Sequence, residues 1–208
     1  MTPMGCNFGD IDNDGFLDVF LGTGGMSYED LIPDLLFKNV GGLRFEDVTM
    51  SSGTGHLQKG HGVSFADFDF DFDGDGALDF FVENGGAAPG DQSHNALFKN
   101  PGHKRHWLDV KLVGTRTNRS ALGAKLRAVV TGADGKARTI HRTIGDNSSF
   151  GGNSLVEHLG LADSTRVDLL EVTWPIGPMI QEFRDLTVDR SIVITEGSAN
   201  IAAIPKRK

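Results

Sequence analysis

Two stretches of the chain carry four aspartates within nine residues at the same spacing. Residues 10–18 read Asp-Ile-Asp-Asn-Asp-Gly-Phe-Leu-Asp, and residues 71–79 read Asp-Phe-Asp-Gly-Asp-Gly-Ala-Leu-Asp. Carboxylates about 4 Å apart repel one another by roughly 4 kcal/mol per pair at an effective dielectric constant of about 20, so a cation between them stabilises the arrangement. Calcium takes about six to eight oxygen ligands in irregular geometry, which suits these loops better than magnesium. The sequence therefore predicts two calcium sites.

Each loop has a predicted set of oxygen ligands, from the side chains at positions 1, 3, 5 and 9 and from one backbone carbonyl. The first set is Asp10, Asp12, Asp14, Asp18 and the carbonyl of Phe16; the second is Asp71, Asp73, Asp75, Asp79 and the carbonyl of Ala77. Gly15 and Gly76 allow a backbone turn that other residues resist. Solvated acidic turns without metal are the alternative interpretation, although turn composition alone hardly produces the same spacing twice.

An EF-hand is the competing interpretation of both loops. It needs a glutamate at position 12 and a helix on each side. Position 12 is Leu21 in the first loop and Val82 in the second, and residues 17–21 and 78–82 are short apolar runs typical of strands. We therefore exclude an EF-hand and expect a strand after each loop.

The similarity between the two stretches continues beyond the loops. Residues 36–39 and 97–100 both read Leu-Phe-Lys-Asn, 61 residues apart, whereas residues 8–10 (Phe-Gly-Asp) align with residues 65–67 (Phe-Ala-Asp) at an offset of 57. Four residues are therefore inserted before the second loop. We expect an extended strand or bulge there, with Asp67 and Asp69 as extra ligands in the alternative. Repeated units of short strands are typical of β-propeller blades.

The second half of the chain predicts a separate all-β unit. The predicted strands are residues 106–114, 125–131, 137–144, 167–174, 179–183 and 191–196. The pair Asp134-Gly135 is a strong signal for a hairpin turn between the second and third of these strands. Successive hairpins with alternating apolar residues favour a small β-sandwich.

These motifs resemble two known families. The aspartate loops, the Leu-Phe-Lys-Asn segments and residues 45–49 (Phe-Glu-Asp-Val-Thr) are similar to FG-GAP/VCBS repeats, the calcium-loop blades of integrin-type propellers. Residues 118–126 (Asn-Arg-Ser-Ala-Leu-Gly-Ala-Lys-Leu) and 167–177 resemble the ASPIC/UnbV domain that follows such repeats in cartilage-acidic-protein-like proteins.

The resemblance implies an all-β fold, with two calcium-loop propeller-type blades (a partial propeller) followed by a small β-sandwich. The blades would occupy residues 1–102 (about 1–60 and 61–102), the sandwich residues 103–199 and a basic tail residues 200–208. Repeat arrays generally need about three or more units. We therefore expect the two blades to be completed by further blades, by the C-terminal domain or by another copy of the chain. The resemblance also implies a secreted or periplasmic setting.

The acidity of the chain belongs to the two loops. The net charge is −8, which the eight loop aspartates account for, and two calcium ions would bring it to −4. This balance argues against nucleic acid as a partner. No segment approaches the length of a membrane span, and the N-terminus lacks the features of a signal peptide. The single cysteine, Cys6, permits no internal disulfide and is expected to be a small buried hydrophobe.

An enzyme is the main alternative function. His103 and His106 could begin a zinc site, but no third ligand stands at a useful spacing. No nucleophile elbow, P-loop or dinucleotide fingerprint is present, although carboxylate pairs suited to glycoside hydrolysis stay open.

We expect a calcium-binding, extracellular-type module that contacts a protein or carbohydrate. The alternatives are a hydrolase or lyase with its site at the junction of the two units or completed by absent blades, and an architectural cap of a larger propeller.

Overall fold

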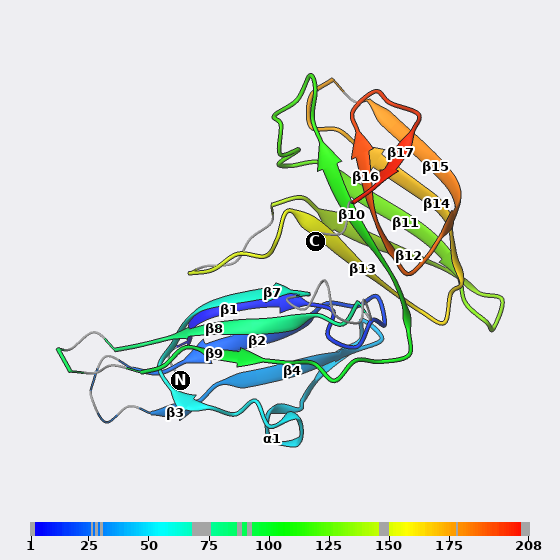
Figure 1. The fold of residues 1–208 in the computed structure, drawn as a ribbon. Helices are drawn as coiled ribbons and strands as arrows, with labels where there is room; N and C mark the ends of the chain where they lie inside the picture. The colour runs from blue at the N-terminus through cyan, green and yellow to red at the C-terminus, as the bar shows by residue number, and fades with distance from the viewer. Residues whose placement is uncertain are drawn as a thin grey trace.

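The computed structural model describes residues 3–25, 27, 29, 31–67, 76–86, 89–90, 93–145, 150–177 and 179–204. Within these ranges the fold is almost entirely β, and α1 (Thr49–Ser52) is the one helix. None of the described helical residues forms a segment long and apolar enough to cross a membrane. Strands β1–β9 lie in the lower part of Figure 1, and β10–β17 lie at its upper right.

The N-terminal half contains two sheets that follow the sequence repeat. The first repeat sheet has the order β1 (Pro3–Gly9), β2 (Asp18–Thr23), β4 (Leu35–Val40), β5 (Arg44–Asp47). The second repeat sheet has the order β7 (Gly60–Ala66), β8 (Asp79–Asn84), β9 (Ala96–Phe98), and β3 (Ile32–Pro33) pairs separately with β6 (Leu57–Gln58). The prediction of a strand after each aspartate loop is confirmed by β2 and β8.

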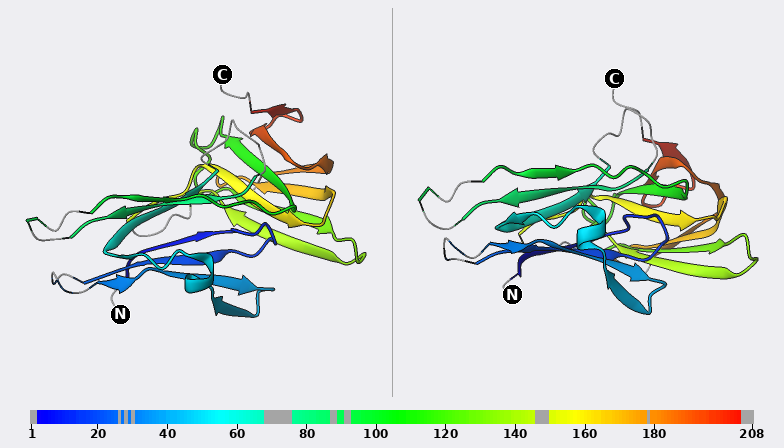
Figure 2. Two further views of the ribbon diagram at one scale, coloured as in Figure 1. Left: turned by 60° about the horizontal axis from the view of Figure 1, so that its bottom comes forward. Right: turned by 90° about the horizontal axis from the view of Figure 1, so that it is seen from below.

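The two repeat sheets stack face to face, as both views in Figure 2 show. Alternate side chains of a strand point to opposite faces, so each sheet can contribute one apolar row to a shared core. Phe20 of the first sheet packs on Phe80 of the second with ring centroids 4.7 Å apart. The other members of this core are Leu36, Val63, Phe65, Leu78 and Val82.

The C-terminal half contains two further sheets of four strands. One has the order β13 (Val156–Ala162), β10 (His106–Val113), β16 (Arg190–Thr195), β17 (Ile201–Ala203), and the other has the order β12 (Ala137–Thr143), β11 (Lys125–Thr131), β14 (Arg166–Thr173), β15 (Ile180–Thr187). Both sheets contribute to one core, which includes Leu108, Leu159 and Ile192 from the first and Leu126 and Leu170 from the second. All pairings are antiparallel except β10 with β16.

The structure corrects the sequence prediction in two places. Strand β13 was missed because His158 and Gly160 interrupt its apolar pattern. The predicted tail at residues 200–208 was wrong for its first part, because Ile201–Ala203 form β17 and pair with β16. All six predicted strands of this half are present, with β11 at the predicted bounds and β15 extending to Thr187.

A buried carboxylate organises the turn that precedes β11. Glu196 Oε2 accepts hydrogen bonds from the backbone N–H groups of Thr115, Arg116 and Thr117 at 2.7–2.8 Å. Burial acts to raise the pKa of Glu196, but these hydrogen bonds outweigh it and hold the pKa at about 2. Asn118 continues the turn, since its side chain both accepts from Leu122 N–H and donates to the Leu122 carbonyl. The Asn-Arg-Ser-Ala-Leu segment is therefore built as turn structure.

Candidate metal centre

The first aspartate loop connects two paired strands of the first repeat sheet. Antiparallel pairing of β1 and β2 places Gly9 opposite Asp18, so the first and last aspartates of the loop start close together. Asn13 and Gly15 adopt left-handed backbone conformations, with φ of 56° and 91°. These turns, which glycine and asparagine tolerate best, fold the loop back on itself.

Three of the loop carboxylates converge in the interior. Asp10, Asp12 and Asp18 each place a carboxylate oxygen within 4.8 Å of the others. Asp10 and Asp18 are fully buried and Asp12 is 5% exposed, so these three side chains are not solvated. Asp14 is not part of the group, and its Oδ1 accepts the N–H of Phe16 at 2.9 Å. Within the first loop, the structure therefore brings together three of the four predicted carboxylate ligands.

The buried carboxylates are only partly satisfied by backbone donors. The two oxygens of Asp10 accept from Asp14 N–H and Gly15 N–H at 3.0 and 2.8 Å. Those of Asp18 accept from Ile11 N–H and Asn39 N–H at 2.9 and 2.7 Å. An ionised carboxylate has about four acceptor sites, so each side chain keeps lone pairs for another donor or a cation.

The electrostatics of the group show the cost of its burial. Desolvation raises the pKa of Asp10 to about 6 and that of Asp18 to about 7. The neighbouring charges of His158 and Arg142 lower the pKa of Asp10 without offsetting the desolvation. A divalent cation held between the carboxylates would favour their ionised forms and reverse both shifts.

Asp12 has cations on one oxygen and no described partner on the other. Lys38 Nζ and Arg105 Nη1 lie 2.5 and 2.9 Å from Asp12 Oδ2. Asp12 Oδ1 is buried and has no hydrogen-bond partner among the described residues. An orphaned buried carboxylate oxygen is costly unless a cation occupies the space it faces. The donor set therefore fits a hard cation that prefers oxygen ligands.

The second loop is described only at its end. Asp71, Asp73 and Asp75 lie outside the described residues, as does Asp69 of the insertion, whereas Ala77 and Asp79 are described and buried. Asp79 Oδ1 accepts the N–H of Asn100 at 2.8 Å, which matches the bond from Asn39 to Asp18.

The asparagine of each Leu-Phe-Lys-Asn segment supports the loop before it. Asn39 Nδ2 donates to the Leu17 carbonyl at 3.1 Å, and Asn100 Nδ2 donates to the Leu78 carbonyl at 3.2 Å. Asn100 Nδ2 also donates to the carbonyl of Ile11 in the first loop at 2.6 Å. The recurrence of these segments at the offset of the loops was the only sequence signal for this role.

The first loop also holds the N-terminal and C-terminal halves together. Asn13 Nδ2 donates to the Gly76 carbonyl of the second loop at 3.1 Å, and the Asn13 carbonyl accepts from Ala162 N–H of β13 at 2.7 Å. Arg105 Nη1 donates to the Asp12 carbonyl at 2.8 Å, and Arg138 of β12 donates to the Asp14 carbonyl. The candidate metal loop is thus a structural junction.

A buried histidine lies at this junction. His158 Nε2 lies 2.7 Å from Asn13 Oδ1, and His158 Nδ1 lies 2.8 Å from Asp109 Oδ1. Because the Asn13 amide donates its N–H to Gly76, its oxygen faces the histidine. Both ring nitrogens therefore face acceptor oxygens. The histidine therefore links β13 to the first loop and to β10.

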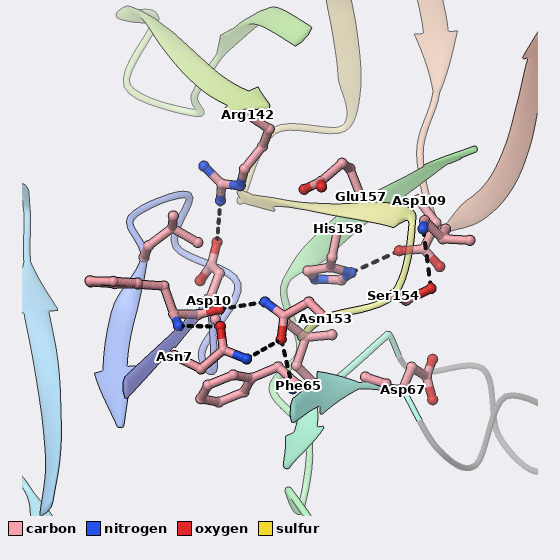
Figure 3. Close-up of a pocket in the computed structure, with 16 residues that line it drawn as sticks. Asn7, Asp10, Phe65, Asp67, Asp109, Arg142, Asn153, Ser154, Glu157 and His158 are labelled. Atoms are coloured by element: carbon pink, nitrogen blue, oxygen red, sulfur yellow. Dashed lines mark hydrogen bonds and ion pairs between the residues drawn. The ribbon is translucent and has the colours of Figure 1, made fainter. Parts of the chain in front are cut away.

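A cavity of about 180 Å³ lies between the two halves beside this histidine (Figure 3). Its ionisable lining residues are Asp10, Asp67, Asp109, Arg142, Glu157 and His158. Asn153 closes one side, accepting from Asn7 Nδ2 at 2.7 Å and from Phe65 N–H at 2.8 Å and donating to the Phe8 carbonyl at 2.8 Å. Because Asn13 and Asp109 occupy both nitrogens of His158, this histidine has no free nitrogen to accept a substrate proton.

The other histidines considered for zinc do not form a site among the described residues. His106 Nδ1 lies 2.8 Å from Asp189 Oδ2 near the surface, and neither His103 nor His106 belongs to a described cluster of three potential ligands.

Residues 114–201 match the ASPIC and UnbV family. The match covers the C-terminal sheets from the loop after β10 to the start of β17. No curated protein matches the chain. The predicted ASPIC/UnbV resemblance of the C-terminal half is therefore confirmed.

Proposed function

We propose that this chain is a calcium-stabilised binding module, in which two propeller-type blades precede an ASPIC/UnbV-like β-sandwich. The observation that carries the proposal is the group formed by Asp10, Asp12 and Asp18, with buried oxygens within 4.8 Å of one another and Asp12 Oδ1 orphaned. The oxygen-only donor set and the irregular loop favour calcium over transition metals, which prefer nitrogen or sulfur ligands.

Asp10, Asp12 and Asp18 would hold the first ion, with Asp14 and the Phe16 carbonyl as the remaining predicted ligands. The repeat assigns the second ion to Asp71, Asp73, Asp75, Asp79 and the Ala77 carbonyl. Bound calcium would supply the positive charge that buried carboxylates lack. It would not carry out chemistry.

The role of the calcium follows from the position of the first loop. The loop contacts the second repeat through the bond from Asn13 to Gly76 and the bond from Asn100 to Ile11, and it contacts the C-terminal half through Ala162 and His158. Ordering this loop would therefore fix the relative positions of the repeat sheets and the C-terminal domain. A rigid surface of this kind suits recognition of a protein or carbohydrate in a secreted or periplasmic setting, where calcium is abundant.

The test is calorimetric titration of chelator-treated chain with calcium, together with thermal melts in calcium and in EGTA. We expect two binding events and a higher melting temperature in calcium. Asp12→Asn should lose one event and keep the other, because it changes only the first loop. Asp185→Asn is the control, since Asp185 is an exposed aspartate far from the loop in sequence. Its backbone has a left-handed φ, which asparagine adopts as readily as aspartate, so the substitution should not strain the chain.

Circular dichroism must show that each variant is folded. Folded wild-type chain that binds no calcium would refute the proposal. Loss of both events in Asp185→Asn would show that the assay reports general destabilisation and not the loop.

A further inference from the structure

The two repeat sheets bury chemically different faces against each other. In the first sheet, Asn7, Phe20 and Leu36 stand side by side in register on one face, which we call the front face. In the second sheet, the buried face is made of two rows. These rows, which we call the back face, are Phe65, Phe80 and Phe98 in one and Val63, Val82 and Ala96 in the other. The internal interface is therefore front face on back face.

Because the two sheets are repeats of each other, the first sheet also has a back face and the second sheet also has a front face. Residues of β7 lie 57 positions after their equivalents in β1, and residues of β8 and β9 lie 61 positions after their equivalents in β2 and β4. With these offsets, the back-face rows of the second sheet correspond to two rows of the first sheet. Those rows are Phe8, Val19 and Phe37 in one and Cys6, Leu21 and Leu35 in the other, and the strand pairings place each row in register. All six residues of the first back face are apolar.

This back face of the first sheet is not buried as its counterpart is. Phe8 is 45% exposed, whereas the equivalent Phe65 is 2% exposed. Leu21 is half-buried, whereas the equivalent Val82 is fully buried. An apolar sheet face of this kind on a folded protein marks an interaction surface.

The front face of the second sheet is also free in part. Its row is Ser64, Phe81 and Leu97, which the strand pairings again place in register. Leu97 is 57% exposed, whereas the equivalent Leu36 is 1% exposed. Residues 150–153 cover the β7 end of this face, because Ser64 Oγ donates to the Gly152 carbonyl at 2.7 Å. At the β9 end of this face, Leu97 stays exposed.

We propose that the back face of the first repeat sheet binds the front face of the second repeat sheet in another copy of this chain. The described residues of the two sheets carry both halves of an interface that the chain already forms internally, and Phe8 on one half and Leu97 on the other are exposed. Docking would continue that interface without a new kind of contact. Because two different surfaces meet, the association is heterologous and leads head to tail into chains or rings.

The proposal does not rest on bound calcium and has its own test. The full chain is examined by sedimentation velocity over a broad micromolar range, in calcium, with three variants. Phe8→Arg places a charge on the back face, and Leu97→Arg places one on the front face. Met50→Arg is the control, because Met50 is 82% exposed on α1, outside both faces.

We expect wild-type and Met50→Arg chains to associate and each face variant alone to be monomeric. Mixing the two face variants should restore a one-to-one dimer, because each keeps the face that the other lacks. Cys6 provides a second readout, since the only thiol lies on the back face. Its reaction with a maleimide should slow in the mixture and not in either variant alone. Leu21→Lys repeats the back-face test if Phe8→Arg does not fold.

A monomeric wild-type chain would overturn the proposal. A dimer abolished by Phe8→Arg, unaffected by Leu97→Arg and not restored by mixing would also overturn it, because that pattern identifies back-to-back pairing. The melting temperature of each variant is also measured in calcium and in EGTA. A variant that still melts higher in calcium has kept its calcium binding, so a loss of association in that variant is a separate result.

Discussion

The backbone N–H of Asn39 donates to Asp18 Oδ1 at 2.7 Å, although the two residues lie 21 positions apart. Asn100 and Asp79 form the same bond at 2.8 Å in the second repeat. The asparagine that ends each Leu-Phe-Lys-Asn segment is therefore hydrogen-bonded to the last aspartate of its own loop. The repeat preserves a side-chain arrangement as well as a strand order.

Asn39→Ala and Asn100→Ala should both destabilise the chain, but to different degrees. Each loses the side-chain bond to the carbonyl before the loop aspartate, whereas Asn100→Ala also loses the bond to Ile11 that joins the two repeats. We expect about 1 kcal/mol for Asn39→Ala and about 2 kcal/mol or more for Asn100→Ala. Urea unfolding in calcium measures both. Equal losses would contradict a bridging role for Asn100.

Stabilisation by calcium should increase with pH between about 5 and 8. Without metal, Asp10 and Asp18 have folded-state pKa values raised to about 6 and about 7. In the calcium-free chain, these two groups therefore contribute stability that is fully present below the ordinary pKa of aspartate and is lost as the pH rises through the raised values. Calcium binds the ionised carboxylates, so its contribution has the opposite sign. The difference in melting temperature between calcium and EGTA should widen as the pH rises; a constant difference would contradict the assignment.

Asp34→Asn should remove a pH-dependent loss of stability that is independent of the metal loops. Asp34 is fully buried, and Oδ1 accepts Thr23 N–H at 2.8 Å while Oδ2 has no partner among the described residues. Burial raises its pKa to about 7. The raised value means that wild-type stability falls as the pH rises from about 4 through about 7.

In saturating calcium, Asp34→Asn should match wild type near pH 4 and exceed it by about 4 kcal/mol near pH 8, because the amide cannot ionise and a change of one pKa unit corresponds to about 1.4 kcal/mol. Denaturant unfolding at the two pH values measures the difference. Asp47→Asn is the control, since Asp47 is exposed and its pKa is lowered by hydrogen bonds from Thr49. If the free energy of unfolding of Asp34→Asn fell with pH as steeply as that of wild type, the prediction would be wrong.

Gly160→Ala should separate the two halves of the molecule. A Cβ on Gly160 would overlap Asp10 Oδ2 and lie 2.6 Å from Asn13 Cα, so β13 could not approach the first loop. We expect a loss of about 3 kcal/mol or more, typical of severe overpacking, and two resolved melting transitions in place of one. Differential scanning calorimetry is the measurement. Gly85→Ala is the matched control, because nothing lies within 4 Å of its added Cβ.

The sequence by itself determined the local features of this protein. The spacing of the aspartates, the strand that follows each loop, the offset of the repeat and most C-terminal strands could be read directly, because these depend on residues close in the chain. The ASPIC/UnbV character of the second half was also readable, from two short segments in order.

Only the tertiary structure decided which of these residues meet. It excluded Asp14 from the carboxylate group, brought Lys38 and Arg105 to Asp12, and set His158 between Asn13 and Asp109. It also showed which apolar rows are covered and which are free. These relationships depend on how strands distant in sequence pack against one another, and the spacing along one strand carries no information about the strand opposite it.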